Sequence, residues 1–179
     1  MVERVVVTGP AGAGKSELAS ELGKRLGLRV LHLDRMFWKP GWVPTPRDEF
    51  EAMQRQEVAA DSWIVEAQFD DMLPDWLDAA DTVVFVDASP LRCLWRVGRR
   101  RMSRHASVGT PAGTTPGALH RALLKFLRNQ WRYRTTVRRK LLAELERGRD
   151  RRVVILRRRD DAASFLLSLD SPSPAGGTV

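Results

Sequence analysis

The stretch Gly9-Pro10-Ala11-Gly12-Ala13-Gly14-Lys15-Ser16 matches the phosphate-binding pattern G-x-x-x-x-G-K-[ST] at every fixed position. Residues 5–8 before it are β-branched and predict a buried strand, and leucines at 18, 22 and 26 follow it at helical spacing. A glycine-rich turn that merely caps a helix is the alternative, but the upstream strand and the Lys-Ser pair argue against it. The sequence therefore predicts a nucleoside triphosphate site.

The motif assigns a role to each of its positions. Glycines allow successive backbone N–H groups to curve around phosphate oxygens, where a Cβ would obstruct that curvature. The following helix contributes its positive N-terminal end. We expect Lys15 to reach the β- and γ-phosphates of ATP and the Ser16 hydroxyl to ligate Mg²⁺. The residues expected to contribute backbone groups to the nucleotide are Gly9, Ala11, Gly12, Ala13 and Gly14.

Length and composition favour one globular domain. The 179 residues suffice for a single core, which we place at 1–170, and the Ser/Pro/Gly-rich segment 171–179 is expected to be a disordered tail. The sequence contains no run of eighteen apolar residues, so we expect no membrane span. With one cysteine, Cys93, no internal disulfide can form, and with a strand starting at Arg4 we expect no signal peptide. A cytoplasmic monomer or homodimer is expected.

The charge divides sharply along the chain. Residues 1–90 hold 9 Lys+Arg against 16 Asp+Glu, whereas residues 91–179 hold 21 against 6. A basic half can bind nucleic acid, or it can supply arginines that close over a triphosphate. A third explanation is coding bias, because Arg outnumbers Lys by 25 to 5.

Strands and helices alternate along the chain. Four further strand-like runs, at 29–33, 62–66, 82–86 and 152–156, are separated by helical patterns. The sequence therefore predicts an α/β fold of the P-loop NTPase type, a five-stranded parallel sheet with helices on both faces. One of these helices is expected to start with Thr45 as its cap and Pro46 in its first position.

Carboxylates end two of the predicted strands. Asp34 follows the second and Glu66 closes the third, at the edge where open parallel sheets bind ligands. Asp34 is a candidate site residue, or alternatively a helix or turn cap. Glu66 is expected to hold Mg²⁺ through water or to polarise an acceptor hydroxyl.

An aromatic stretch follows Asp34. Residues 36–44 combine three aromatic side chains with prolines and a glycine, which excludes a long helix. We expect Phe37 and Trp38 to line an acceptor pocket, with Arg35 available to a polar or anionic substrate. A hydrophobic plug is the alternative for the aromatic residues.

The basic half is predicted to be mostly helical. The helix after Ser89-Pro90 is expected to turn Leu91, Leu94, Trp95 and Val97 inward, and the opposite stripe includes Arg92, Arg96, Arg99 and Arg100. That stripe either binds a polyanion or is a solvated face. Small polar residues with Gly and Pro predict a small lid at about 103–120. A long helix with Arg132 and Arg134 follows, ending at Gly148, and a last helix is expected to begin at Asp160 or Asp161.

The chain resembles the adenylate-kinase-like P-loop kinases, and most closely the family of DNA topology modulation proteins. The narrowest shared feature is Leu33-Asp34-Arg35-Met36-Phe37-Trp38-Lys39-Pro40-Gly41-Trp42; the phosphate loop and the runs 63–66, 80–87 and 152–157 also match. The resemblance implies a nucleotide- or shikimate-kinase-like fold and ATP-dependent phosphoryl transfer to a small acceptor, whose identity it leaves open. Where the family usually has Asp-Gly-Asn-Tyr, this chain has Glu66-Ala67-Gln68-Phe69, which suggests a specialised substrate.

The leading hypothesis is a small-molecule or nucleotide kinase. Asp34 or Glu66 would orient the acceptor, and Phe69 would join the acceptor site. The resemblance places Arg157 near the adenine. The cationic residues expected to neutralise the transferring phosphoryl group are Arg96, Arg100 and Arg104, helped by Arg132 or Arg134. The alternative is a nucleotide-switched regulator that binds DNA through its basic half.

Overall fold

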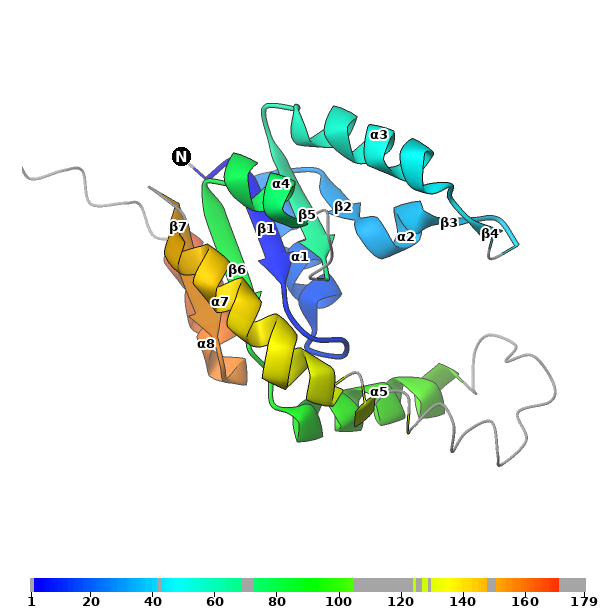
Figure 1. Cartoon of the computed structure of the whole chain (residues 1–179). Helices are drawn as coiled ribbons and strands as arrows, with labels where there is room; N and C mark the ends of the chain where they lie inside the picture. Colours follow the sequence, from blue (N-terminus) through cyan, green and yellow to red (C-terminus); the bar gives the residue numbers. More distant parts are fainter. Residues whose placement is uncertain are drawn as a thin grey trace, which may run out of the picture.

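The computed structural model describes residues 2–41, 43–68, 73–104, 124, 127, 128, 130–147 and 151–170. Its centre is a parallel five-stranded sheet with the strand order β2-β5-β1-β6-β7 (Figure 1). The bounds are Arg4–Thr8 for β1, Val30–His32 for β2, Trp63–Ala67 for β5, Thr82–Val86 for β6 and Arg152–Leu156 for β7. The fold predicted from the sequence is thereby confirmed.

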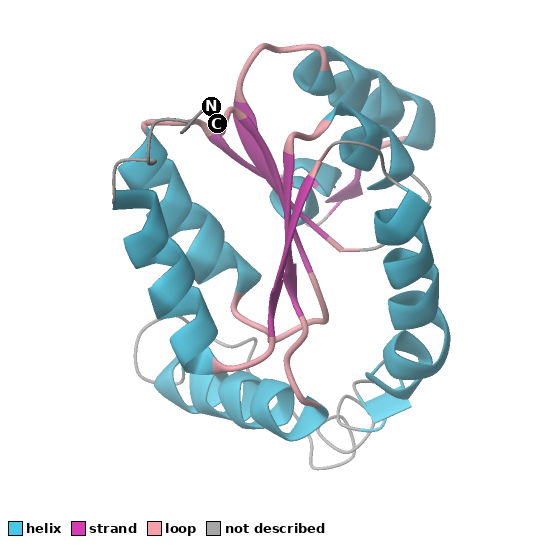
Figure 2. Cartoon of the chain, turned by 90° about the vertical axis from the view of Figure 1, so that its left-hand side faces the viewer, coloured by secondary structure: helices cyan, strands magenta, loops and turns pink. Residues whose placement is uncertain are grey.

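Helices cover both faces of this sheet, which Figure 2 shows nearly edge-on. Val5 and Val7 of β1 point to one face, where the core is completed by α1 (Lys15–Leu26) and α8 (Arg159–Asp170). Val6 points to the other face, where α4 (Leu73–Ala79) and α7 (Arg138–Arg147) pack. The alternation of side chains along a strand therefore divides the core into two layers.

The segment after β2 differs from its prediction in two details. β2 ends at His32, and Leu33–Phe37 form the short helix α2, so Asp34 lies in the first turn of a helix rather than directly after a strand. The antiparallel pair β3 (Trp38–Lys39) and β4 (Val43–Pro44) follows. α3 spans Arg47–Val58 after Pro46, and the buried Thr45 hydroxyl donates to the Met36 carbonyl instead of capping that helix.

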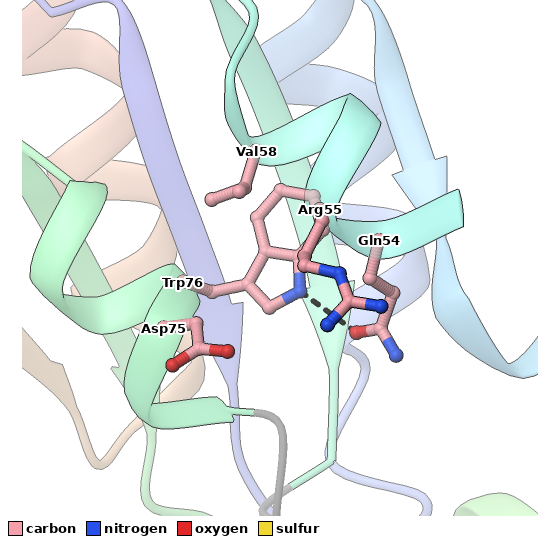
Figure 3. Close-up of a pocket in the computed structure, with 5 residues that line it drawn as sticks. All are labelled: Gln54, Arg55, Val58, Asp75 and Trp76. Atoms are coloured by element: carbon pink, nitrogen blue, oxygen red, sulfur yellow. Dashed lines mark hydrogen bonds between the residues drawn. The ribbon is translucent and has the colours of Figure 1, made fainter. Parts of the chain in front are cut away.

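The contact between α3 and α4 is partly polar. Trp76 Nε1 donates to Gln54 Oε1 at 2.8 Å, and both side chains are fully buried (Figure 3). Beside them Arg55, Val58 and Asp75 complete the lining of a cavity of about 10 Å³, which is room for a single water molecule. This cavity belongs to the packing of α3 on α4 and not to the edge of the sheet that carries the phosphate loop.

Helix α5 (Pro90–Arg104) is turned differently from its prediction. Leu91 is 79% exposed and Trp95 is 61% exposed, whereas Cys93 is completely buried. The predicted inward face is therefore wrong for Leu91 and Trp95. In their place, Arg92 donates to the Arg157 carbonyl and Arg96 donates to the Ala13 carbonyl, and these contacts set the rotation of the helix.

A π-helical turn, η1 (Tyr133–Val137), precedes α7, and the Arg138 N–H donates to the Tyr133 carbonyl across it. The last helix begins at Arg159, one or two residues before the predicted start at Asp160 or Asp161. Among the helices of the described residues, none has the length and apolar character needed to cross a membrane. Most of the predicted lid, Phe69, Gly148 and the tail 171–179 lie outside the described residues, as do the side chains of Arg100 and Arg104.

Candidate nucleotide site

The phosphate loop connects β1 to α1 at the carboxyl edge of the sheet. Its three glycines at 9, 12 and 14 have φ angles of 148°, 82° and 100°, all in the region that favours glycine. A Cβ on Gly9 would lie 2.5 Å from the Val86 carbonyl oxygen, so the backbone leaves no room for a side chain there. A Cβ on Gly14 would meet the flexible end of the Arg96 side chain, and at that position the positive φ is the stronger reason for glycine.

Lys15 and Ser16 converge on Glu66 next to this loop. The Lys15 ammonium lies 3.7 Å from Glu66 Oε1 and donates to the Pro10 carbonyl at 3.3 Å. The Ser16 hydroxyl donates to Glu66 Oε2 at 3.1 Å. The Lys15 side chain is only 5% exposed, so burial lowers its pKa, while the charges of Glu66 and Asp34 oppose that shift. The structure therefore brings together Lys15, Ser16 and Glu66, three of the predicted site residues.

His32 completes this cluster from the neighbouring strand. A hydrogen bond of 2.8 Å joins His32 Nδ1 to Glu66 Oε2, and the His32 side chain is mostly buried. Residues 32 and 66 are directly paired in the register of β2 and β5, which explains why the two side chains meet. Sequence reasoning missed His32, although the rule that selected Glu66, a polar residue at the carboxyl end of a strand, applies to it equally.

The carbonyl groups of the loop are held by side chains from distant elements. Arg96 Nη1 donates to the Ala13 carbonyl at 3.1 Å and lies 3.5 Å from the Glu17 carboxylate. Gln130 Nε2 donates to the Ala11 carbonyl at 3.0 Å. Arg96 was predicted to lie at this site. Gln130 was not predicted, because an isolated glutamine in a helical pattern carries no recognisable signal.

A second ionic cluster lies at the end of β6. Arg138 donates to Asp87 from Nε to Oδ1 at 3.0 Å and from Nη2 to Oδ2 at 2.8 Å. The pKa of Arg138 is raised, chiefly by this hydrogen bonding. Arg157 Nε lies 3.9 Å from Asp87 Oδ2 with its side chain largely exposed. The Tyr133 hydroxyl is buried with no hydrogen-bond partner among the described residues, and burial raises its pKa.

The predicted acceptor residues lie on and after α2. Asp34 is exposed and accepts a hydrogen bond of 3.2 Å from Gln68 Nε2, and Arg35 is also exposed. The Phe37 ring makes edge-to-face contacts with Trp38 at 5.1 Å and with Phe50 at 5.3 Å. Phe37 therefore packs partly into the protein while Trp38 is 43% exposed. Arg132 and Arg134 are exposed on the helix that leads to α7.

The residues present suit a nucleotide with Mg²⁺. A loop in which a Cβ on Gly9 or Gly12 would meet a backbone carbonyl, with Lys15 and Ser16 at its end, fits a phosphate chain. The Ser16 hydroxyl and the Glu66 carboxylate are oxygen ligands of the kind that Mg²⁺ prefers, and Mg²⁺ bound in such sites keeps several waters and phosphate oxygens. The described residues contain no cluster of three His, Cys, Asp or Glu that could hold a metal without those additional ligands.

A parallel sheet with a glycine loop after its central strand is the P-loop NTPase fold. Solved structures with this fold include shikimate kinase from Acinetobacter baumannii in complex with shikimate, with a TM-score of 0.58 and 14% identity over 94% of this chain and 91% of that chain. Shikimate kinase from Bacteroides thetaiotaomicron has a TM-score of 0.54 and 16% identity, covering 95% of this chain and 97% of that one. A putative kinase from Chloroflexus aurantiacus has a TM-score of 0.50 and 14% identity, covering 95% and 98%.

At these low sequence identities, the structural similarity shows the fold of the chain and nothing more specific. No family model matches the chain. No curated protein matches it either. The finer resemblance to DNA topology modulation proteins therefore stays a prediction.

Proposed function

We propose that this chain is an ATP-dependent kinase that transfers the γ-phosphoryl group of ATP to a small-molecule or nucleotide acceptor. One observation carries the proposal: the buried Lys15 ammonium, the Ser16 hydroxyl and the Glu66 carboxylate meet at the end of a glycine loop. That grouping suits a triphosphate with its cation, and a fold shared with shikimate kinases supports the same class of reaction. ATP and Mg²⁺ are the implied cofactors.

The nucleotide half of the site is assigned to the phosphate loop. The loop amides and Lys15 would bind the phosphate chain of ATP, and Ser16 with Glu66 would hold Mg²⁺. Bound Mg²⁺ supplies charge neutralisation on the phosphate oxygens. We assign the adenine end to Arg157 on the resemblance to the P-loop kinases. Arg157 follows the last strand and lies 3.9 Å from Asp87.

The acceptor half is assigned to α2 and the end of β5. Asp34 or Glu66 would orient the hydroxyl or phosphate oxygen that receives the phosphoryl group, with Arg35, Phe37, Trp38 and Phe69 around it. Asp34 is close enough to Lys15 to oppose the lowering of the Lys15 pKa, which supports a common site. The arginines proposed to stabilise the transferring group are Arg96, Arg100 and Arg104, with Arg132 or Arg134.

The test of this proposal is nucleotide binding by Lys15→Ala. Losing one charge-assisted hydrogen bond costs about 1.5–3 kcal/mol, so ATP·Mg²⁺ should bind at least ~10-fold more weakly in calorimetry. Turnover should be lost. Lys24→Ala is the matched control, because Lys24 is exposed on the same helix. Equal ATP affinity in the Lys15→Ala variant and the unmodified protein would contradict the assignment.

The acceptor is to be found by an ATP-consumption screen with the full chain. Nucleosides, nucleotides, sugars, amino acids and other hydroxylated metabolites cover the acceptor classes of the proposal. Stimulation by one class that disappears in the Lys15→Ala variant identifies the acceptor. ATP binding without stimulation by any class would leave a nucleotide-binding protein without the proposed transfer.

A further inference from the structure

Gln130 makes an unusual contact with the phosphate loop. It is a polar side chain that is only 5% exposed, and its Nε2 donates to the Ala11 carbonyl at 3.0 Å. The two residues are separated by 119 positions in the chain. A buried amide so far from the loop in sequence, yet bonded to the middle of it, has a role that the Lys15 cluster does not explain.

The hydrogen bond from Gln130 to the Ala11 carbonyl also fixes the direction of a neighbouring N–H group in the loop. In a trans peptide the C=O and the following N–H point in opposite directions within one plane. A donor that holds the Ala11 carbonyl therefore also holds the Gly12 N–H on the opposite side. Arg96 acts in the same way on the Ala13 carbonyl and hence on the Gly14 N–H. The amides of a phosphate loop bind anions only when they point toward the ligand together.

The shape of the helix explains how Gln130 reaches the loop. Eight residues further on, Arg138 binds the Asp87 carboxylate at the end of β6. In a regular α-helix, residues eight apart lie about 80° apart around the axis. The π-helical turn between them, Tyr133–Val137, absorbs one extra residue and brings Gln130 and Arg138 close to the same side. Both can therefore bond to the same edge of the sheet.

We propose that Gln130 is a positioning residue that orients the Gly12 amide toward the phosphate chain of ATP. The inference rests on the proposed nucleotide site and goes beyond it, because it assigns phosphate affinity to a helix that contributes no motif residue. Gln130 acts through the Ala11 peptide and touches no substrate. Its effect is therefore confined to the part of the ligand that the loop binds.

The test compares Gln130→Met, which keeps the length of the side chain but removes the donor, with the unmodified full-length protein. We expect the Kd for ATP·Mg²⁺ to rise about 3- to 10-fold, the effect of losing one neutral hydrogen bond. The affinity for adenosine, followed by ligand-observed NMR, should not change, because adenosine has no phosphate chain. Arg139→Met is the control, since Arg139 is exposed on the same helix.

Gln130→Glu gives a second measurement that does not depend on the Met variant folding. It keeps the side-chain shape but faces the Ala11 carbonyl with an acceptor, so the loss of ATP affinity should be at least as large. Unchanged ATP affinity in either folded variant overturns the inference. So does an equal loss for ATP and adenosine, which would show a merely structural role. Failure of the unmodified protein to bind ATP is a different result, and it overturns the proposed function along with the inference.

Discussion

Among the glycines of the described residues, Gly9 is the one whose Cβ would come nearest to a backbone atom. A Cβ there would meet the backbone carbonyl of Val86 at 2.5 Å, and a backbone atom in a buried strand cannot move aside as a side chain can. Gly27 also has a positive φ, of 68°, but a Cβ on it would meet nothing within 4 Å. Both positions therefore have a positive φ that would strain any other residue, but only Gly27 has free space for a side chain.

We predict that Gly9→Ala destabilises the protein far more than Gly27→Ala does. The Gly27 variant should lose about 1–2 kcal/mol through its φ alone, whereas the Gly9 variant should lose more than about 3 kcal/mol. Urea unfolding followed by circular dichroism measures both. Similar losses of stability in the two variants would mean that the backbone of β6 can shift at Val86.

The residues of the site differ in how visible they are from the sequence. Lys15, Ser16 and the loop glycines stand in one contiguous pattern, and Glu66 was found because it closes a strand. Gln130 could not be found, because its role depends on a contact with a loop 119 residues away. Local patterns report on local geometry, whereas the packing of a later helix against an early loop exists only in the folded chain.

At the scale of single elements, α5 shows how an amphipathic pattern can mislead. Apolar residues at helical spacing normally face a core, and that rule pointed Leu91 and Trp95 inward. The neighbourhood of α5 is polar, however, because it includes the Ala13 and Arg157 carbonyls that receive Arg96 and Arg92. Donating to those carbonyl groups turns the arginine side of α5 toward the protein.

The orientation of α5 predicts a contrast between two tryptophans. Trp95 is 61% exposed and has the Arg99 guanidinium 5.3 Å from its ring, so Trp95→Ala should cost less than about 1 kcal/mol. Trp76 is 1% exposed, and Trp76→Ala should cost about 3–5 kcal/mol, since it creates a cavity and removes the partner of Gln54. Thermal unfolding of both variants checks the contrast. A large loss of stability in the Trp95→Ala variant would show that this face of α5 packs against another surface.

Across the whole molecule, the five parallel strands and the helical layers on both faces follow from patterns that the sequence displays, whereas the order of the strands comes from the structure. Each strand is a short apolar run, and the helices between them impose parallel neighbours. The structure describes only residues 103 and 104 of the predicted lid. The acceptor chemistry depends on a surface that no motif specifies. The sequence therefore predicts the scaffold and the nucleotide loop in more detail than it predicts the substrate.

Some of the arginines of the basic half, residues 91–179, make contacts within the protein. Among its described arginines, Arg96 binds the loop, Arg138 binds Asp87, and Arg151 donates to the Leu77 and Glu144 carbonyls. These contacts make those guanidinium groups less accessible to a duplex, and Asp87 neutralises the charge of Arg138. The alternative of a DNA-binding regulator is therefore open to a direct measurement.

We predict that a short labelled DNA duplex binds no more tightly than about 1 µM at ~0.15 M salt, the range of non-specific association. Fluorescence anisotropy over a salt series, with and without ATP·Mg²⁺, measures this. Tight binding that falls steeply with salt and responds to nucleotide would favour the regulator over the kinase.

Cys93, the only cysteine of the chain, has a practical consequence for experiments of this kind. It is completely buried behind the phosphate loop, and burial raises the pKa of its thiol, so the reactive thiolate is both scarce and inaccessible. A cysteine introduced at an exposed position such as Lys140 would be the preferred target of a maleimide dye in the native protein. Distance and fluorescence probes can thus be attached at chosen points without first replacing a residue packed against Ala13 and Ala88.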